Sequence, residues 1–137
     1  MSVAARRVAL DASALLAWVL RERGHETVDK LLAVAVIPAS AMVETLYRAR
    51  EKGHTQSSGA LHADLLALGL TVEPVTDDDT VRAAELILDS KAEPGRGSLS
   101  LGDGLCIAVA ERLVLPVTGG DRYWEQVPST VKFLPFR

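Results

Sequence analysis

The chain lacks the features by which several classes of protein are recognised. It has one cysteine and three scattered histidines, so we expect neither an internal disulfide framework nor a zinc site of regular spacing. No run of about 18 apolar residues is present to span a membrane, and Asp11 interrupts the apolar stretch near the N-terminus, which argues against a secretory signal. The net charge of −3 gives no overall attraction to nucleic acid. These absences predict a cytoplasmic protein with no membrane segment, in which any contact with nucleic acid comes from a local basic patch.

What remains is the composition of an ordinary globular protein. The chain has 137 residues, of which 48% are hydrophobic and 24% are charged, and this length predicts one domain over residues 1–137. Short apolar runs alternate with longer segments of helical period. Strands separated by helices predict an α/β fold, here a three-layer α/β/α sandwich with a mostly parallel central sheet.

The expected elements follow from periodicity and from glycine, proline and capping residues. Helices are expected over residues 12–22, 25–35, 41–53, 57–69, 80–90 and 101–113. Strands are expected over residues 8–11, 34–38, 71–75, 115–119 and 131–134. Ser40 is expected to cap the third helix, and residues 76–79 to form the cap and acidic first turn of the fifth. The most loop-like segment is 91–100.

Four acidic residues stand at the edges of these elements. Asp11 and Asp121 come at or just beyond the ends of expected strands, whereas Glu44 and Asp103 fall in the first turns of expected helices. Each has an ordinary structural explanation. The two residues that follow strands can cap helices, Glu44 can pair with the arginine four residues later, and Asp103 can close a capping box with the serine three residues before it.

Taken together, the four carboxylates favour a different explanation. In a parallel sheet their positions converge on one edge, which is where ligands bind. Carboxylates gathered there would repel one another and raise one another's pKa unless cations offset them. Ligands that are all oxygen suit hard ions such as Mg²⁺ or Mn²⁺, and such ions can activate a water and stabilise charge on a phosphodiester. The pattern therefore favours a metal-dependent nuclease.

The stretches LDASALLAWV, SAMVETLYRAR and SLSLGDGLCIAVAERLVLPVTGGDRYW, with the expected terminal strand, resemble the PIN-domain family in order and spacing. The resemblance covers nearly the whole chain, and the size of the chain is similar to that of the VapC-type toxins of prokaryotic toxin–antitoxin pairs. It implies a Mg²⁺- or Mn²⁺-dependent endoribonuclease that forms a homodimer. It also implies inhibition by a small VapB-like antitoxin, with operator DNA bound only through that antitoxin.

The resemblance also assigns roles to individual residues. The acidic quartet of the family falls on Asp11, Glu44, Asp103 and Asp121, and Ser13 matches the hydroxyl residue that supports the first aspartate. Asp11 and Asp103 would hold the metal most directly. Glu44 would complete the metal shell or position the attacking water. Asp121 would bind a second ion or hold the first through a water.

At one position the sequence departs from the family. The family often has Thr-x-Asp before Arg-x-Trp, whereas here Gly119 occupies the hydroxyl position and Thr118 lies one place earlier. A hydroxyl that orients Asp121 or a substrate phosphate is therefore missing or displaced. This departure leaves open a catalytically weak PIN domain that acts mainly as a protein-binding partner or co-repressor. A second alternative, an α/β domain that binds a phosphorylated ligand, requires a glycine-rich phosphate loop, and LDASALLAW contains no glycine.

The remaining candidates concern substrate, core and partner. Arg48 and Arg122 are the candidate RNA-binding side chains, because arginine at a phosphate positions a strand without reading its sequence; a solvated charged face is the alternative. Cys106 and Trp124 are expected to be core residues.

An antitoxin is expected to bind an apolar groove on the helices at 12–22 and 40–52. There it would place an Arg or Lys among the carboxylates, because a guanidinium can engage them in bidentate fashion. The apolar residues expected to line this groove are Leu16, Leu20, Leu46 and Tyr47.

Overall fold

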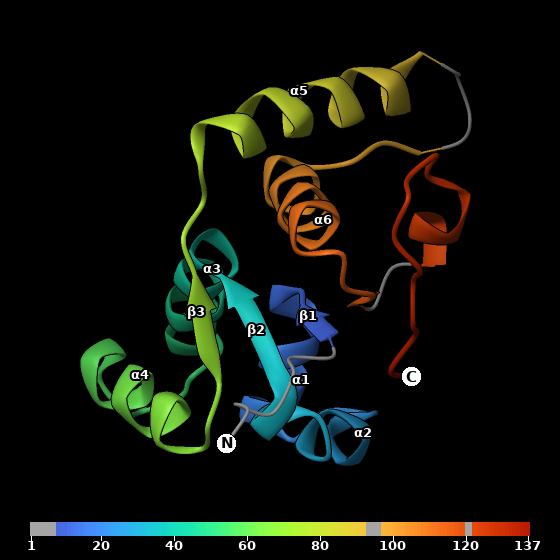
Figure 1. Cartoon of the computed structure of the whole chain (residues 1–137). Helices are drawn as coiled ribbons and strands as arrows, with labels where there is room; N and C mark the ends of the chain where they lie inside the picture. The colour runs from blue at the N-terminus through green and yellow to red at the C-terminus, as the bar shows by residue number, and fades with distance from the viewer. Residues whose placement is uncertain (1–7, 93–96, 120–121) are drawn as a thin grey trace, which may run out of the picture.

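A parallel sheet lies at the centre of the computed structural model, which describes residues 8–92, 97–119 and 122–137 (Figure 1). Strands β1 (Val8–Leu10), β2 (Ala35–Pro38), β3 (Thr71–Glu73) and β4 (Val117–Thr118) lie in the order β3-β2-β1-β4. All three neighbouring pairs are parallel, as predicted. The helices that connect the strands are α1 (Ala12–Leu20), α2 (His25–Asp29), α3 (Ala39–Glu51), α4 (Ser58–Ala67), α5 (Asp77–Lys91) and α6 (Leu101–Leu113). Two 3₁₀ helices, η1 (Leu32–Val34) and η2 (Arg122–Gln126), complete the described elements.

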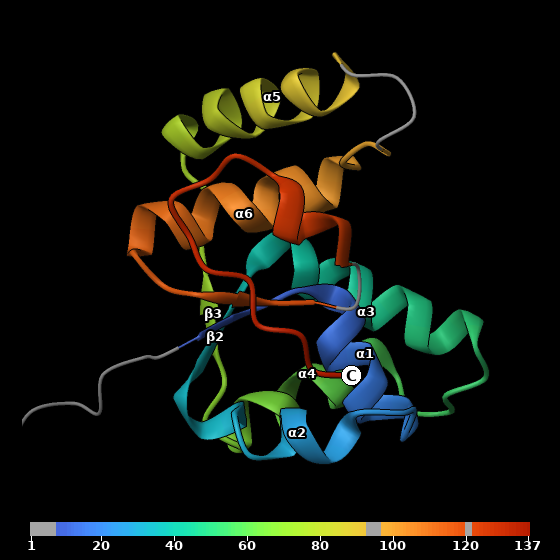
Figure 2. The same ribbon diagram turned by 90° about the vertical axis from the view of Figure 1, so that its right-hand side faces the viewer.

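Helices cover both faces of this sheet. Along β1, Val8 and Leu10 point into a core shared with α1, α2, α3 and α4, whereas Ala9 points into a second core shared with α5 and α6. The same alternation places Ile37 of β2 in the first core and Val36 in the second. Figure 2 shows α5 and α6 on one side of the sheet and α1 and α2 on the other. The predicted three-layer α/β/α arrangement is therefore confirmed.

Several predicted boundaries are wrong, and pairing or proline explains them. The helix expected over 25–35 ends at Asp29, and η1 follows over Leu32–Val34, so that the chain is extended from Ala35 and pairs there with both β1 and β3. Tertiary pairing thus overrides a helical pattern that is locally sound. The strands expected over 71–75 and 115–119 are shorter, since Pro74 follows β3 and Pro116 precedes β4, and proline has no N–H to donate.

The expected strand at 131–134 does not form as a strand. A single parallel bridge joins Val117 to Phe133, with hydrogen bonds from Val117 N–H to the Lys132 carbonyl (2.9 Å) and from Leu134 N–H to the Val117 carbonyl (2.8 Å). Because β4 itself has only two residues, it offers little length for pairing. The segment therefore passes β4 and continues toward α1 and α2.

The predicted caps at Thr76 and Ser100 are present on α5 and α6, and Ser57 caps a further helix, α4. Ser40 is the exception, because α3 begins at Ala39 directly after Pro38, and Ser40 therefore lies inside the first turn. Its hydroxyl is buried and has no hydrogen-bond partner among the described residues.

Helices α5 and α6 are held together by close packing and by arginine–carboxylate pairs. Arg82 on α5 contacts Glu111 on α6 at 2.7 Å, and Arg112 on α6 contacts Asp79 on α5 at 3.0 Å. A Cβ added at Gly104 would lie 2.7 Å from the Ile87 side chain, so only glycine lets the helices approach this closely. Among the described residues, no helix has the length and apolar character needed to cross a membrane.

Candidate active site

Asp11 lies at the carboxyl end of β1 and begins the candidate site. Its N–H donates to the Thr118 carbonyl at 2.9 Å, which continues the contact between β1 and β4 by one residue. Its carboxylate caps α1, because Oδ2 accepts hydrogen bonds from the Ser13 N–H (3.3 Å) and the Ser13 hydroxyl (2.7 Å). The capping explanation for Asp11 is therefore present in the structure, together with a hydrogen bond from the serine predicted to support it.

The Asp11 carboxylate is buried, and no cation of the described residues compensates its charge. The residue is 8% exposed, and this burial raises the pKa of Asp11 to about 6. The hydrogen bond from Ser13 acts in the opposite direction, and the negative charge of Asp103 raises the pKa further. No Lys or Arg of residues 8–92, 97–119 or 122–137 forms an ion pair with Asp11. A positive charge delivered from outside the described chain would therefore find an uncompensated ligand.

Glu44 and Asp103 face the same space from α3 and α6. One Glu44 oxygen, Oε2, accepts a hydrogen bond from Arg48 at 2.8 Å, while Oε1 lies so close to Gly102 that a Cβ there would be 2.9 Å away. Asp103 closes a capping box, since Oδ2 accepts from the Ser100 N–H at 3.0 Å and its own N–H donates to the Ser100 hydroxyl at 3.1 Å. Both structural explanations from the sequence are therefore observed.

The structure brings three of the four predicted carboxylates into one cavity of about 510 Å³. Its lining consists of Asp11, Ser13, Glu44, Arg48, Ser100, Asp103 and Arg137. The charges of the three carboxylates also raise the pKa of the buried Cys106 thiol, although burial is the larger cause. Asp121 lies outside the described residues. Within the described part of the chain, no three acidic, histidine or cysteine side chains are already arranged around a single ion position.

Residues 8–128 match the family model of the PIN domain. The chain belongs to the PIN-domain family. No curated protein sequence gives a significant match.

Solved structures show the same PIN fold. The chain is similar to VapC20 of Mycobacterium tuberculosis, a sarcin–ricin loop cleaving toxin, with 19% identity, a TM-score of 0.71 and coverage of 90% of this chain and 96% of that chain. It is also similar to a DNA-bound VapBC of Salmonella typhimurium, with 13% identity, a TM-score of 0.74 and coverage of 96% and 98%. For FitAcB from Neisseria gonorrhoeae the identity is 20%, the TM-score 0.67 and the coverage 91% and 96%. At these identities the similarity shows the fold.

Gly119, the position at which the sequence departs from the PIN pattern, packs directly against Asp11. A Cβ added at Gly119 would lie 3.3 Å from the Asp11 Cβ and 3.4 Å from both Asp11 Oδ2 and the Trp124 ring. The neighbouring hydroxyl of Thr118 is buried and has no partner in the described part of the chain. Absence of a side chain at 119 therefore lets Asp11 and Trp124 approach the same backbone.

The two predicted RNA-binding arginines lie in different surroundings. Arg48 lines the carboxylate cavity and pairs with Glu44. Arg122 is not among the residues that line it; its guanidinium contacts Glu125 at 3.1 Å and donates to the carbonyl of Arg137 at 3.3 Å. Arg137 does line the cavity, and the sequence analysis missed it. No local pattern marks it, because only the path of the chain after β4 brings it to the carboxylates.

The expected apolar groove on α1 and α3 is largely used by the core. Leu16 is 4% exposed, and Leu20 and Leu46 pack against the same core, whereas Tyr47 is 51% exposed. The prediction of an exposed Leu16 is wrong, because α1 and α3 pack on each other as well as on the sheet, whereas Leu20 and Leu46 are partly buried. Cys106 and Trp124 are buried core residues, as predicted.

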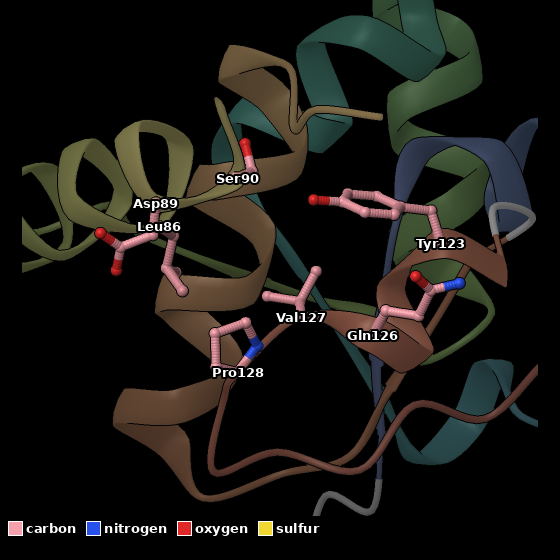
Figure 3. A pocket seen from close by; sticks show the side chains of 7 residues that line it. All are labelled: Leu86, Asp89, Ser90, Tyr123, Gln126, Val127 and Pro128. Carbon is pink, nitrogen blue, oxygen red and sulfur yellow. The ribbon is translucent and has the colours of Figure 1, made fainter. Parts of the chain in front are cut away.

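A second cavity lies away from the carboxylates, between α5 and η2 (Figure 3). It has a volume of about 310 Å³, with Leu86, Val127 and Pro128 on its apolar side. Figure 3 shows the Tyr123 hydroxyl pointing into it and the Asp89 carboxylate turned away from Tyr123. Asp89 is the one carboxylate among the described residues that line this cavity, so it does not offer the group of three carboxylates found at Asp11.

Proposed function

We propose that this PIN domain is a Mg²⁺- or Mn²⁺-dependent endoribonuclease, the toxin of a VapBC-type toxin–antitoxin pair. The observation that carries the proposal is the buried Asp11 carboxylate, which shares a cavity with Glu44 and Asp103 and has no cation partner in the described chain. A nuclease that binds a divalent cation would need such a site. The name of VapC20, a toxin that cleaves the sarcin–ricin loop, supports RNA as the substrate class.

The chemistry of these residues fits a hard cation. All three side chains offer oxygen, and burial of Asp11 favours any ligand that offsets its charge. Asp11 and Asp103 would hold the ion, with Asp121 as a further ligand. When bound, Mg²⁺ or Mn²⁺ lowers the pKa of a coordinated water and stabilises charge on the phosphodiester.

The protein residues have separate tasks in this proposal. Ser13 fixes the orientation of the Asp11 carboxylate through its two hydrogen bonds. Glu44 accepts a hydrogen bond from Arg48 at Oε2, and Oε1 lies against Gly102, so its carboxylate is held at the cavity, where it would position the attacking water. Arg48 contributes positive charge beside the cavity, where it can contact a phosphate of the strand.

The partners follow from the same assignment. The VapBC complexes among the similar structures support a small VapB-like antitoxin, through which operator DNA would be bound. An exposed apolar patch consisting of Val43, Tyr47 and Leu101 adjoins the carboxylate cavity, since Glu44 and Ser100 line both. An antitoxin segment lying on this patch could insert an arginine among the carboxylates. The family resemblance supports a homodimer, which sedimentation of the purified protein would test.

The experiment that tests the function is cleavage of cellular RNA by the purified protein, with 5′-end sequencing of the fragments. We expect EDTA to stop cleavage and Mg²⁺ or Mn²⁺ to restore it, with Zn²⁺ a poor substitute. Asp103→Asn should abolish cleavage and serves as the control for contaminating nuclease. Cleavage that continues in EDTA, or that survives in Asp103→Asn, would rule out the proposed mechanism. A folded protein that binds its antitoxin but cleaves no RNA would support the alternative suggested by glycine at position 119. In that alternative the chain is a catalytically weak PIN domain that acts mainly by binding a protein partner.

A further inference from the structure

The chain that follows β4 is anchored so that Arg137 lies at the carboxylate cavity. The bridge between Val117 and Phe133 holds the beginning of this tail. Phe136 is buried in the core beneath the sheet, and it lies so close to Gly24 that a Cβ there would be 2.7 Å from the Phe136 carbonyl oxygen. Figure 2 shows the tail passing the sheet and ending in front of α1. Burial of Phe136 therefore fixes the position of Arg137, although Arg137 itself is exposed.

The Arg137 side chain is a cation with no ion pair in the described chain. Its guanidinium stacks over the Phe136 ring, with 5.0 Å between the guanidinium carbon and the ring centroid. The Arg137 carbonyl accepts a hydrogen bond from Arg122, which adds a second hold on the backbone. No carboxylate among residues 8–92, 97–119 and 122–137 lies within 4.0 Å of its guanidinium nitrogens. Arg48, the other arginine of the cavity, is already paired with Glu44.

This arrangement meets a need of an acidic cavity that must receive an anion. Three carboxylates repel a phosphodiester, so a strand can enter only where cations face it. An arginine binds two phosphate oxygens through its planar fork, and a guanidinium already stacked on a ring loses less freedom on binding than a free side chain. Resting on the proposed ribonuclease function, we propose that Arg137 is a positioning residue that binds a phosphate of the RNA strand across the cavity from Asp11 and Asp103.

The experiment compares Arg137→Gln with Arg137→Lys and with Lys132→Gln. Lys132 is an exposed cation of the same tail that does not line the carboxylate cavity, so it is a matched control for loss of one positive charge. Steady-state cleavage of a short single-stranded RNA in Mg²⁺ gives KM and kcat for each variant. Binding of the same RNA to the Asp103→Asn protein, with and without each tail substitution, gives the dependence of Kd on salt.

We expect Arg137→Gln to raise KM about 10-fold, because a charge-assisted contact is lost, with little change in kcat. The slope of log Kd against log salt should fall by about 0.7, the value for one phosphate contact on a single strand. Arg137→Lys should keep the slope and recover part of the affinity, since lysine keeps the charge and loses the fork. Lys132→Gln should match the unsubstituted protein in both measurements.

Two results would overturn the inference while leaving the ribonuclease in place. One is an active protein in which Arg137→Gln and Lys132→Gln have the same KM and salt slope. The other is tighter Mg²⁺ binding by Arg137→Gln, measured calorimetrically, with an unchanged salt slope, because Arg137 would then be a counter-ion for the carboxylates. An unsubstituted protein that neither binds nor cleaves RNA would overturn the proposed function and this inference together.

Discussion

Asp79 and Asp11 are both buried aspartates in the first residues of a helix, yet the structure shifts their pKa values in opposite directions. Burial acts to raise the pKa of Asp79, but hydrogen bonds from Arg112 and from Thr76 outweigh it and hold that pKa below its ordinary value. Burial also raises the pKa of Asp11, and there the hydrogen bonds from Ser13 do not offset it, so the pKa reaches about 6. The two sites differ in their charged neighbours, since Asp79 has Arg112 and Asp11 has Asp103.

The same contrast extends to the surroundings of each residue. Between α5 and α6, Glu111 also has an arginine, Arg82, whose hydrogen bond keeps the pKa of Glu111 low against the effect of burial. In the carboxylate cavity, Glu44 forms an ion pair with Arg48, but the charged neighbour of Asp11 is the carboxylate of Asp103. Carboxylates between the helices thus balance their charge within the described chain and serve stability. In the carboxylate cavity Asp11 has no such arginine partner among the described residues, and a bound cation would supply the missing positive charge.

The contrast between Asp11 and Asp79 should have its largest effect on the rate of RNA cleavage. We expect Asp11→Asn to lower Mg²⁺-dependent RNA cleavage by about 1,000-fold, because the bound ion loses a ligand. That ion stabilises the charge of the transition state by several kcal/mol. Asp79→Asn should leave cleavage by the folded fraction within about 3-fold, since Asp79 does not line the carboxylate cavity. Single-turnover rates with matched folded concentrations measure both. Similar losses in the two variants would show that the groups do not differ in function.

Stability without metal should change with opposite sign. Asp11→Asn is expected to raise the free energy of unfolding at pH 7 by up to about 3 kcal/mol, because it removes a buried and uncompensated charge. Asp79→Asn should lower it by about 1–3 kcal/mol, since Arg112 loses its partner. Urea denaturation in EDTA gives both values. A loss of stability in Asp11→Asn would mean that its role as a helix cap dominates.

The pH dependence follows from the direction of each shift. The native pKa of Asp11 lies above the value of 3.8 expected for the unfolded chain, so the native state holds the proton more tightly and stability falls as pH rises from about 4 to 6. The depressed pKa values of Asp79 and Glu111 act with the opposite sign, because stability falls as pH drops below their ordinary values of 3.8 and 4.5. Denaturation in EDTA across pH 3–8 should therefore show the loss between about 4 and 6 in the unsubstituted protein and not in Asp11→Asn. A wild-type curve that is flat there would contradict the assignment of Asp11.

Two glycines give a smaller comparison of the same regions. Gly104→Ala should lower stability by about 1–3 kcal/mol, because the new methyl group meets Ile87 and forces α5 away from α6. Gly119→Ala should affect cleavage more than stability, since its methyl group presses on Asp11 at 3.3 Å, where a shift of a few tenths of an ångström suffices. Thermal unfolding and cleavage rates of the two variants provide the comparison. A Gly119→Ala protein with normal cleavage and lowered stability would contradict it.

The smallest expected difference lies within the acidic quartet. The cleavage rate of Asp121→Asn should be about 10-fold higher than that of Asp103→Asn. The reason is that Gly119 lacks the hydroxyl that would orient Asp121. Single-turnover cleavage at saturating Mg²⁺ measures both rates. Equal losses would show that the glycine does not weaken the fourth position.

Much of this protein could be read from its sequence because the relevant signals are local. The alternation of short apolar runs with helical segments predicted the parallel three-layer fold, and Ser57, Thr76 and Ser100 cap helices whose starts were predicted within a few residues. The carboxylates at strand ends and helix starts were also visible, since β-strand ends in a parallel sheet share an edge. Asp11, Glu44 and Asp103 accordingly line one cavity.

Other properties depend on residues that are distant in the sequence, and only the tertiary structure decided them. A strand over 34–38 was predicted, but its place between β1 and β3, with which it pairs on both sides, is set by segments that no single window of the sequence contains. Arg137 reaches the carboxylates because Phe136 is buried against Gly24, more than a hundred residues earlier in the chain. Asp79 and Asp11 are alike as sequence features of a helix start. Their opposite charge balance arises because α6 brings Arg112 to one and Asp103 to the other.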